Sequence, residues 1–180
     1  MGLFDLFKKG NKLPKTKDLV WKNQAAKFNG CLKLIAQYPD AVWISWFAET
    51  LSSFNQFIGT KNGIKLEIRM ARSVMPFMVE TKRVFFLEHY PLRIEEENLI
   101  QTWNTLEINV LNALDEPLFE QFGGDRIINL MEKLGMREDE FLEHAMISNS
   151  IRNAQDKLQQ KVTVENITNS SKEWFKMNIG

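Results

Sequence analysis

The stretch AVWISWFAETLSSFNQFIG, residues 41–59, sets the fold class of this 180-residue chain. Its first part, Ala41–Phe47, is a compact run of β-branched and aromatic residues, which is typical of a buried strand. In the second part Leu51, Phe54 and Ile58 recur at helical spacing, and Gly59 is expected to end the helix. A buried strand followed at once by an amphipathic helix is the unit from which parallel sheets are built.

The same alternation continues downstream. Further strands are predicted at residues 64–70, 83–90 and 106–114. One helix is expected from Pro91, with acidic residues near its positive end, and a short one over 125–135, with Asp125 as its N-cap. We therefore predict an α/β domain of three layers, with a mainly parallel sheet covered on both faces.

Helical spacing dominates both flanks of this domain. Trp21, Ala25 and Phe28 begin one apolar face that predicts a helix from Thr16 to Tyr38. A narrow apolar seam predicts a second helical segment over 138–162, and a last helix should follow it. The predicted organisation is a flexible apolar-basic tip and linker at 1–14, an N-terminal helix at 15–40, the α/β domain at 41–137, and a C-terminal helical arm at 138–180.

Charge is balanced overall but uneven along the chain. The formal net charge is zero, so no global field attracts nucleic acid or a membrane surface. Residues 1–40 carry eight lysines and three aspartates, which indicates a basic arm on a mildly acidic body.

Cys31 is the only cysteine, so neither a disulfide nor a cysteine metal cluster can form within the chain. The N-terminus lacks the apolar core of a signal peptide, and we expect a cytoplasmic protein.

The first residues form a short apolar-basic tip. Leu3, Phe4, Leu6 and Phe7 could touch a membrane surface or a partner, helped by neighbouring lysines. One short segment of this kind binds membranes weakly. The tip is therefore interpreted as a disordered tail with at most weak peripheral membrane contact.

The sequence offers little catalytic chemistry. Residues 59–66, GTKNGIKL, have the wrong spacing for a Walker loop and lack its hydroxyl residue. His89 and His144 each follow a glutamate, but neither has a second ligand at helical spacing, so both are interpreted as structural and no metal or cofactor is expected. Between Ile94 and Asp125 there are eight acids and neither lysine nor arginine, so a phosphate-binding or specific nucleic-acid surface is not expected there.

A more specific signal lies in residues 115–158, DEPLFEQFGGDRIINLMEKLGMREDEFLEHAMISNSIRNAQDKL. This stretch resembles the end of the second motor domain of the bacterial preprotein translocase ATPase SecA. The family has an acidic pair after a strand, a Phe-Gly-x-Asp-Arg-Ile block, Leu-Gly-Met, Glu-His and an Ile-x-x-Ala-Gln-x-Lys helix, in that order. A fainter resemblance extends over residues 41–165. The matching residues that we interpret as structural are Asp115, Gly123, Asp125, Arg126, Glu143, His144 and Gln155.

The resemblance implies a RecA-like fold, related to P-loop NTPases, without hydrolysis. The family's Walker loop lies in another motor domain, and its Gly-Arg-rich arginine-finger motif is replaced here by NLIQTWNTLE, residues 98–107. Its Thr-Asp-rich coupling motif is missing between Ala71 and Lys82. We therefore interpret the chain as a degenerate second motor domain that acts as a protein-binding or accessory module. The expected partner is an unidentified protein of the export machinery, and the expected contact residues are Leu3, Phe4, Phe7, Trp174 and Phe175.

Two other functions stay open at this point. The chain could be one subunit of a composite ATPase whose Walker loop is supplied by another chain, although the missing arginine motif argues against this. It could also bind a small molecule or nucleic acid, with the lysine-rich N-terminal segment giving weak, salt-sensitive attraction.

Overall fold

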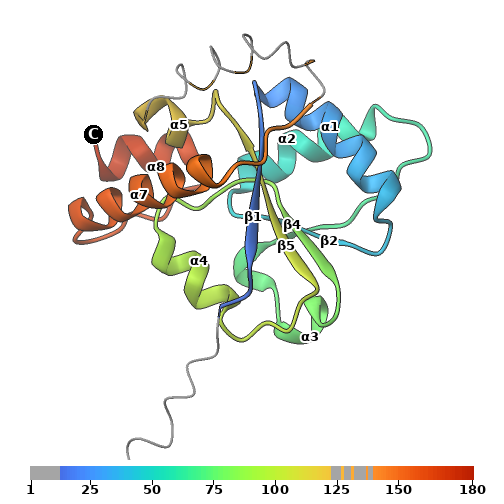
Figure 1. Cartoon of the computed structure of the whole chain (residues 1–180), viewed down its shortest axis with the longest axis horizontal. Helices are drawn as coiled ribbons and strands as arrows, with labels where there is room; N and C mark the ends of the chain where they lie inside the picture. The colour runs from blue at the N-terminus through green and yellow to red at the C-terminus, as the bar shows by residue number, and fades with distance from the viewer. Residues whose placement is uncertain (1–12, 123–126, 128–130, 132–136, 138–139) are drawn as a thin grey trace, which may run out of the picture.

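A computed structural model describes residues 13–122, 127, 131, 137 and 140–180 (Figure 1). Within them, five strands form one sheet in the order β1-β5-β4-β2-β3, and every neighbouring pair is parallel. The α/β class with a parallel sheet is thus confirmed. The elements are β1 (Thr16–Trp21), α1 (Gln24–Gln37), β2 (Val42–Ser45), α2 (Ala48–Gly59), β3 (Ile68–Met70), α3 (Pro76–Val79), β4 (Arg83–Phe86), α4 (Arg93–Ile100), β5 (Glu107–Ala113), α5 (Pro117–Phe122), α7 (Ala145–Lys161) and α8 (Ser171–Asn178).

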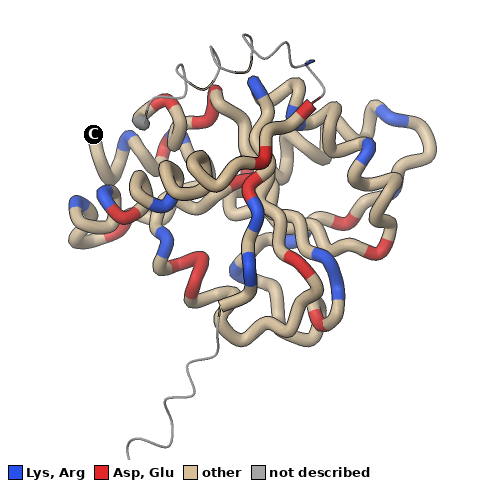
Figure 2. Tube along the Cα trace, in the orientation of Figure 1, with Lys and Arg blue, Asp and Glu red and all other residues tan. Residues whose placement is uncertain are grey.

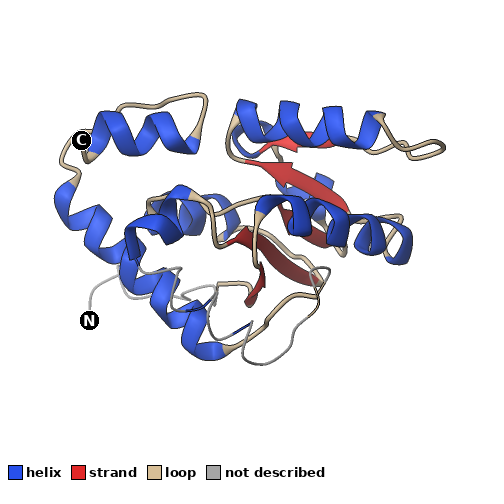
Figure 3. Cartoon of the chain, turned by 90° about the horizontal axis from the view of Figure 1, so that it is seen from above, coloured by secondary structure: helices blue, strands red, loops and turns tan. Residues whose placement is uncertain are grey.

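Helices cover both faces of the sheet, which makes three layers (Figure 3). On one face, Trp43 and Phe85 pack with the apolar sides of α1 and α2. On the other, Ile44 and Phe86 pack with residues of α4, α5, α7 and α8. Successive residues of β2 and β4 therefore enter opposite cores, as the two-residue period of a strand requires. This arrangement is consistent with a three-layer RecA-like fold.

The N-terminal segment is not one helix. Thr16–Trp21 forms β1, which pairs in parallel with β5 from Thr16↔Ile108 to Trp21↔Ala113, and the helix begins only at Gln24. The prediction of a helix from Thr16 was wrong because Leu19, Val20 and Trp21 are all buried, with Val20 in one core and its neighbours in the other. A strand buried on both faces reads as a continuous apolar run, and its last residue, Trp21, also stands at helical spacing from Ala25 and Phe28.

The C-terminal helices belong to the same core as the sheet. Ile147, Ile151 and Leu158 of α7 are buried in the cluster that contains Phe86 of β4. Before this helix, Leu142 makes a single antiparallel bridge with Val20 of β1. The predicted helices are present, beginning at Ala145 and Ser171, but they do not project as an arm.

The remaining sequence expectations have mixed outcomes. The strand predicted over 64–70 is limited to Ile68–Met70, and the helix expected from Pro91 begins at Arg93. Most of the helix predicted over 125–135, with Asp125 as its cap, lies outside the described residues. Basic and acidic residues are interspersed along the described chain, and the lysines from Lys15 to Lys33 lie in or beside β1 and α1 rather than on an arm (Figure 2). No helix in the described part is long and apolar enough to span a bilayer.

Candidate functional site

The carboxyl ends of the strands contain a topological switch point. The chain leaves β2 toward β3 on one side, and it leaves β4 toward β5 on the other. In open parallel sheets, ligands bind in the crevice formed where two adjacent strands diverge in this way. The residues just after β2 and β4 are therefore the first place to look for a site.

Glu88 occupies this switch point. It follows β4, and its Oε1 accepts hydrogen bonds from the backbone N–H groups of Trp46 and Phe47, the latter at 3.2 Å, and from the Ser45 hydroxyl at 2.9 Å. Phe47 is the N-cap of α2. The carboxylate thus lies at the positive end of that helix, where orphan backbone donors attract an anion. Burial raises the pKa of Glu88 to about 7, although nearby Lys27 acts to lower it.

Lys27 lies beneath the site and is fully buried, which is unusual for a lysine side chain. It comes from α1, and its Nζ donates to the Leu87 carbonyl at 2.7 Å and to the Glu116 carboxylate. Burial acts to lower its pKa, but the charges of Glu116 and Glu88 outweigh this effect, so the pKa lies above its ordinary value. Lys27 is therefore a buried cation that ties α1 to the ends of β4 and β5.

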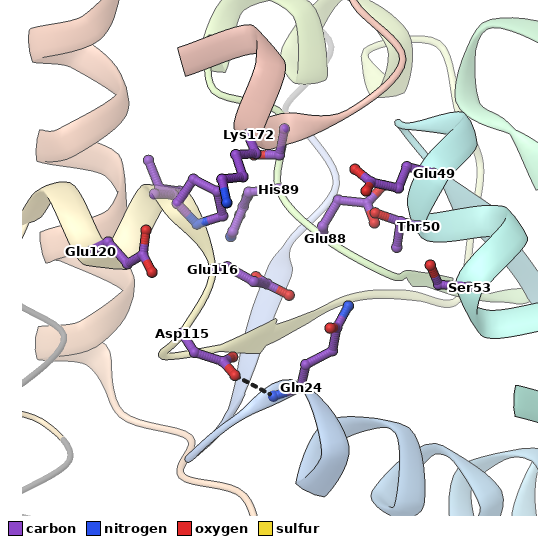
Figure 4. A pocket seen from close by; sticks show the side chains of 13 residues that line it. Gln24, Glu49, Thr50, Ser53, Glu88, His89, Asp115, Glu116, Glu120 and Lys172 are labelled. Atoms are coloured by element: carbon purple, nitrogen blue, oxygen red, sulfur yellow. Dashed lines mark hydrogen bonds between the residues drawn. The ribbon is translucent and has the colours of Figure 1, made fainter. Parts of the chain in front are cut away.

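A cavity of about 280 Å³ opens above these groups (Figure 4). Its walls come from α1, α2, the segment after β4, α5 and its preceding turn, and the start of α8. At one wall, Asp115 accepts a hydrogen bond from the backbone N–H of Gln24 at 3.1 Å. The charged side chains that line the cavity are Glu49, Glu88, Asp115, Glu116, Glu120 and Lys172, together with His89.

A second buried polar cluster centres on His89. Its Nε2 lies 2.8 Å from Asp18 and its Nδ1 lies 2.9 Å from Glu96. Burial acts to lower the pKa of His89, but the two carboxylates outweigh it and raise the pKa to about 10. Gln155 of α7 adds bonds to Glu96 and to the Tyr90 carbonyl, at 3.0 and 2.8 Å. An imidazolium held between two carboxylates is a poor general base, so this cluster joins β1, α4 and α7 structurally.

The family-motif residues that the structure describes lie at several different places. Asp115 lines the cavity and Gln155 belongs to the His89 cluster, so the fold uses both. His144 is the N-cap of α7, where its Nδ1 accepts from the Met146 backbone N–H at 3.1 Å, and Glu143 is exposed. Gly123, Asp125 and Arg126 lie outside the described residues. The structural interpretation of the histidines agrees with these contacts.

Two of the expected contact residues lie in the core rather than at the surface. Trp174 and Phe175 are buried, with exposed fractions of 0% and 6%, so the expectation of exposed tail anchors was wrong. They were misjudged because a short amphipathic helix looks the same whether its apolar face meets a partner or its own core. The Trp174 indole Nε1 donates to Glu165 at 2.6 Å, which satisfies its only polar atom. Leu3, Phe4 and Phe7 lie outside the described residues.

Sequence reasoning missed the two residues that organise the site. Lys27 stands within a largely apolar helical stretch, AAKFNGCL at 25–32, and a lysine in that setting is a signal for a buried ion pair. Glu88 directly follows a run of buried strand residues, which is the sequence position of ligands in parallel sheets. Its true partners are 41 to 43 residues away, so no local pattern could have named them.

The fold and the site together define an α/β protein with a parallel sheet and a polar crevice at the carboxyl ends of its strands. One segment of the chain is also similar in sequence to the protein translocase subunit SecA. The chain is 45% identical over 49 residues to the protein translocase subunit SecA of Psychrobacter sp. PRwf-1, and 49% identical over 49 residues to that of Acidithiobacillus ferrooxidans. It is 45% identical over 47 residues to SecA 1 of Alkaliphilus metalliredigens.

The extent of this similarity is limited. The aligned segment covers 26–27% of this chain and 5% of each of these relatives. Its length is close to that of the 115–158 stretch that carries the sequence motifs. No protein-family model matches the chain. Among the described residues, no cluster of three or more His, Cys, Asp or Glu side chains is arranged to hold a metal ion.

Proposed function

We propose that this chain is a non-catalytic, SecA-like domain that acts in the cytoplasm as a protein-binding or accessory module linked to protein export. In this proposal it derives from the second motor domain and has lost nucleotide hydrolysis. The link to export rests on the SecA-related segment. The non-catalytic role rests on the switch point.

The single observation that carries the proposal is the position of the Glu88 carboxylate. In nucleotide-binding α/β domains, the helix N-terminus at the switch point receives a phosphate. Here the Trp46 and Phe47 backbone N–H groups, directly before α2, already bind Glu88 Oε1, and the Glu49 N–H binds the Asn169 carbonyl. Glu49, Asp115 and Glu120 line the adjoining cavity, and their charge would repel a phosphate chain. An internal carboxyl group in the phosphate position supports a scaffold that no longer binds nucleotide.

Exposed apolar side chains favour a protein partner. Phe77 of α3 and Leu106, just before β5, are 71% and 72% exposed. Two backbone hydrogen bonds, Thr81 N–H to Asn104 and Leu106 N–H to Lys82, hold the segments that carry them together. Large apolar side chains of this kind are enriched in protein interfaces. They are a better basis for protein binding than the buried Trp174 and Phe175.

Nucleotide binding is the decisive test. We expect magnesium-ATP at millimolar concentration to leave the melting temperature and the tryptophan fluorescence unchanged, and we expect no ATP turnover. A ligand at 100 times its Kd would stabilise the folded state by about 2.7 kcal/mol, which a thermal melt detects easily. A saturable rise in melting temperature would therefore contradict the proposal.

The composite ATPase makes the opposite prediction. If another chain supplied the Walker loop, mixing this protein with SecA would give turnover above that of SecA alone, and the gain would disappear in Arg93→Ala or Arg126→Ala. Arg93 pairs with Glu97 and Asp156 across α4 and α7, so Arg93→Lys is the control that keeps a charge there. Association with SecA without added turnover would support the accessory role, and absence of any association would remove the link to export.

A further inference from the structure

We propose that the cavity at the carboxyl ends of the strands binds the cationic side chain of an arginine or lysine presented by a protein partner. The inference rests on the proposed protein-binding function and deepens it, because it assigns the chemistry of one contact. The carboxyl-edge cavity is defined here by its lining residues Gln24, Glu49, Thr50, Ser53, Glu88, His89, Asp115, Glu116, Pro117, Leu118, Glu120, Ser171 and Lys172.

The charge of the cavity favours a cation. Five carboxylates line it, against Lys172 and the His89 imidazolium, whose charge is already paired with Asp18 and Glu96. Buried Lys27 pairs with Glu116 from below and so compensates one of the five. Glu49, Asp115 and Glu120 are exposed at the mouth and come from α2, the turn after β5, and α5. Figure 4 shows their side chains on separate walls around the opening, so a guest would meet acids from more than one direction.

A buried oxygen of Glu88 without a hydrogen-bond partner among the described residues indicates where the cationic side chain would bind. All the donors that reach Glu88 bind its Oε1. Its Oε2 is buried and has no hydrogen-bond partner among the described residues, although Glu88 lines the cavity and is only 5% exposed. Buried acceptors are rarely left unpaired, because desolvation without a new hydrogen bond costs free energy. An N–H donor entering the cavity would complete this carboxylate once the side chains that cover the buried Oε2 shift to expose it.

The size of the cavity and the donors that its oxygens require favour a single cationic side chain as the ligand. The volume of about 280 Å³ falls just below the ~300–1,000 Å³ typical of small-molecule sites, which favours a single side chain over a larger ligand. A metal ion is disfavoured, since the described residues hold no cluster of three suitable ligands. A guanidinium presents several donors in a plane and can bind two carboxylates at once, and an ammonium presents three. Either group would match acids at the mouth and Glu88 at the base.

The test is an NMR titration of the intact chain at pH 8, where Glu88 is ionised, with N-acetyl-arginine methylamide, N-acetyl-lysine methylamide and the neutral isostere N-acetyl-citrulline methylamide. We expect saturable amide shifts from the arginine or lysine compound at Trp46–Glu49, Glu88, Asp115, Glu116 and Leu118, and none from citrulline. Raising the salt concentration should weaken binding, because the mouth acids are exposed.

Matched variants locate the site. Glu49→Gln and Glu120→Gln should each weaken binding about two- to fivefold, the range for an exposed charge pair. Glu80→Gln at the end of α3, also exposed but outside the cavity lining, should change nothing. Glu88→Gln should abolish binding while its amide oxygen still accepts the bonds from Ser45, Trp46 and Phe47. If that variant does not fold, the Glu49→Gln, Glu120→Gln double variant carries the test.

Several results would overturn the inference: equal shifts from citrulline, shifts confined to other regions, unchanged affinity in the mouth variants, or binding of spermidine but of neither amino-acid compound. Its failure is distinct from failure of the proposed function. Magnesium-ATP binding would contradict the non-catalytic role and leave a demonstrated arginine site in place. Absence of guanidinium and ammonium binding would remove this site and leave the nucleotide result untouched.

Discussion

Gly30 is a residue whose lack of a side chain matters for packing. A Cβ built at this position in α1 would lie 2.4 Å from Nε1 of the buried Trp21 indole. Trp21 cannot withdraw easily, because it packs in the core between the sheet and α1. Mid-helix glycine usually weakens a helix, so its presence here reflects the close approach of the ring.

We expect Gly30→Ala to lower the free energy of unfolding by about 1–3 kcal/mol, the usual cost of overpacking, despite the better helix propensity of alanine. Gly59→Ala, at the end of α2 where nothing lies within 4 Å, is the matched control and should be neutral or stabilising by up to about 1 kcal/mol. Urea denaturation of both variants measures this. Equal effects at the two positions would rule out the packing explanation.

Glu88 should make stability depend on pH. Its pKa is about 7 in the folded protein against about 4.5 in an unfolded chain. Between these values the folded state holds more protons than the unfolded state, so the free energy of unfolding falls as pH rises. Relative to Glu88→Gln, the wild type should lose up to about 3 kcal/mol between pH 4.5 and 7.5.

The measurement is urea denaturation of both proteins at closely spaced pH values. Titrating groups that do not interact with Glu88 cancel in the difference, so the remaining pH dependence belongs to Glu88 and its neighbours Lys27 and Glu116. Parallel stability curves would show that burial does not hold the Glu88 proton, and a rising wild-type curve would give the opposite sign. The same variant is the one that tests the cation site, so its folding is established by this experiment.

At the scale of elements, α8 is the piece whose role changed most between sequence and structure. Trp174 is fully buried and makes edge contacts with Tyr90 and Phe175. Glu165 accepts bonds from both the Trp174 indole and the Tyr90 hydroxyl, so the segment before α8 is tied to the loop after β4. The helix is thus a fixed wall of the core and helps to line the carboxyl-edge cavity through Ser171 and Lys172.

Trp174→Ala should lower the free energy of unfolding by about 3–5 kcal/mol, as expected for removal of a buried tryptophan. Met177→Ala in the same helix is the control, because Met177 is 55% exposed and its loss should stay within about 0.5 kcal/mol. Chemical denaturation compares the two. A small effect of Trp174→Ala would mean that α8 detaches readily, which would revive its interpretation as an external anchor.

At the scale of the whole molecule, the two cores share one sheet. Trp21 and Trp43 lie in the core beside α1 and α2, while Trp46, Trp103 and Trp174 lie in the other. β1 joins the two, since Val20 faces one core and Leu19 and Trp21 face the other. The described residues of β1, α7 and α8 therefore share these cores with the central strands.

We accordingly expect one cooperative unfolding transition. Tryptophan fluorescence and far-ultraviolet circular dichroism should give the same midpoint in urea, as two-state behaviour requires. The backbone amides of α7 should exchange at rates similar to those of β5, and not faster. Separate midpoints, or early exchange of α7 and α8 alone, would instead support an N-terminal helix and a C-terminal arm attached to a central domain.

The alternation of strands and helices from residue 41 onward was readable from sequence because it depends on local periodicity. Buried strands show short runs of β-branched and aromatic residues, and helices show apolar residues three and four apart. Asp115 and Gln155 could likewise be singled out, because they belong to an ordered set of motifs. Thr16–Trp21 could not be assigned correctly, since its apolar run is only three residues long and its last residue continues the helical spacing of the next segment, so only pairing with β5 identifies the strand.

The sequence by itself determined the α/β class, the parallel sheet and the SecA-related segment, because each depends on residues that are neighbours in the chain. Only the tertiary structure decided that Glu88 fills the anion position at the start of α2, that Lys27 pairs with Glu116, and that Trp174 is buried. The hydrogen bond between Trp46 and Glu88 joins residues 42 positions apart in the sequence, and the bond between Lys27 and Glu116 joins residues 89 positions apart. Burial and electrostatics act through space, so the groups that would exclude a phosphate became visible only when the sheet brought them together.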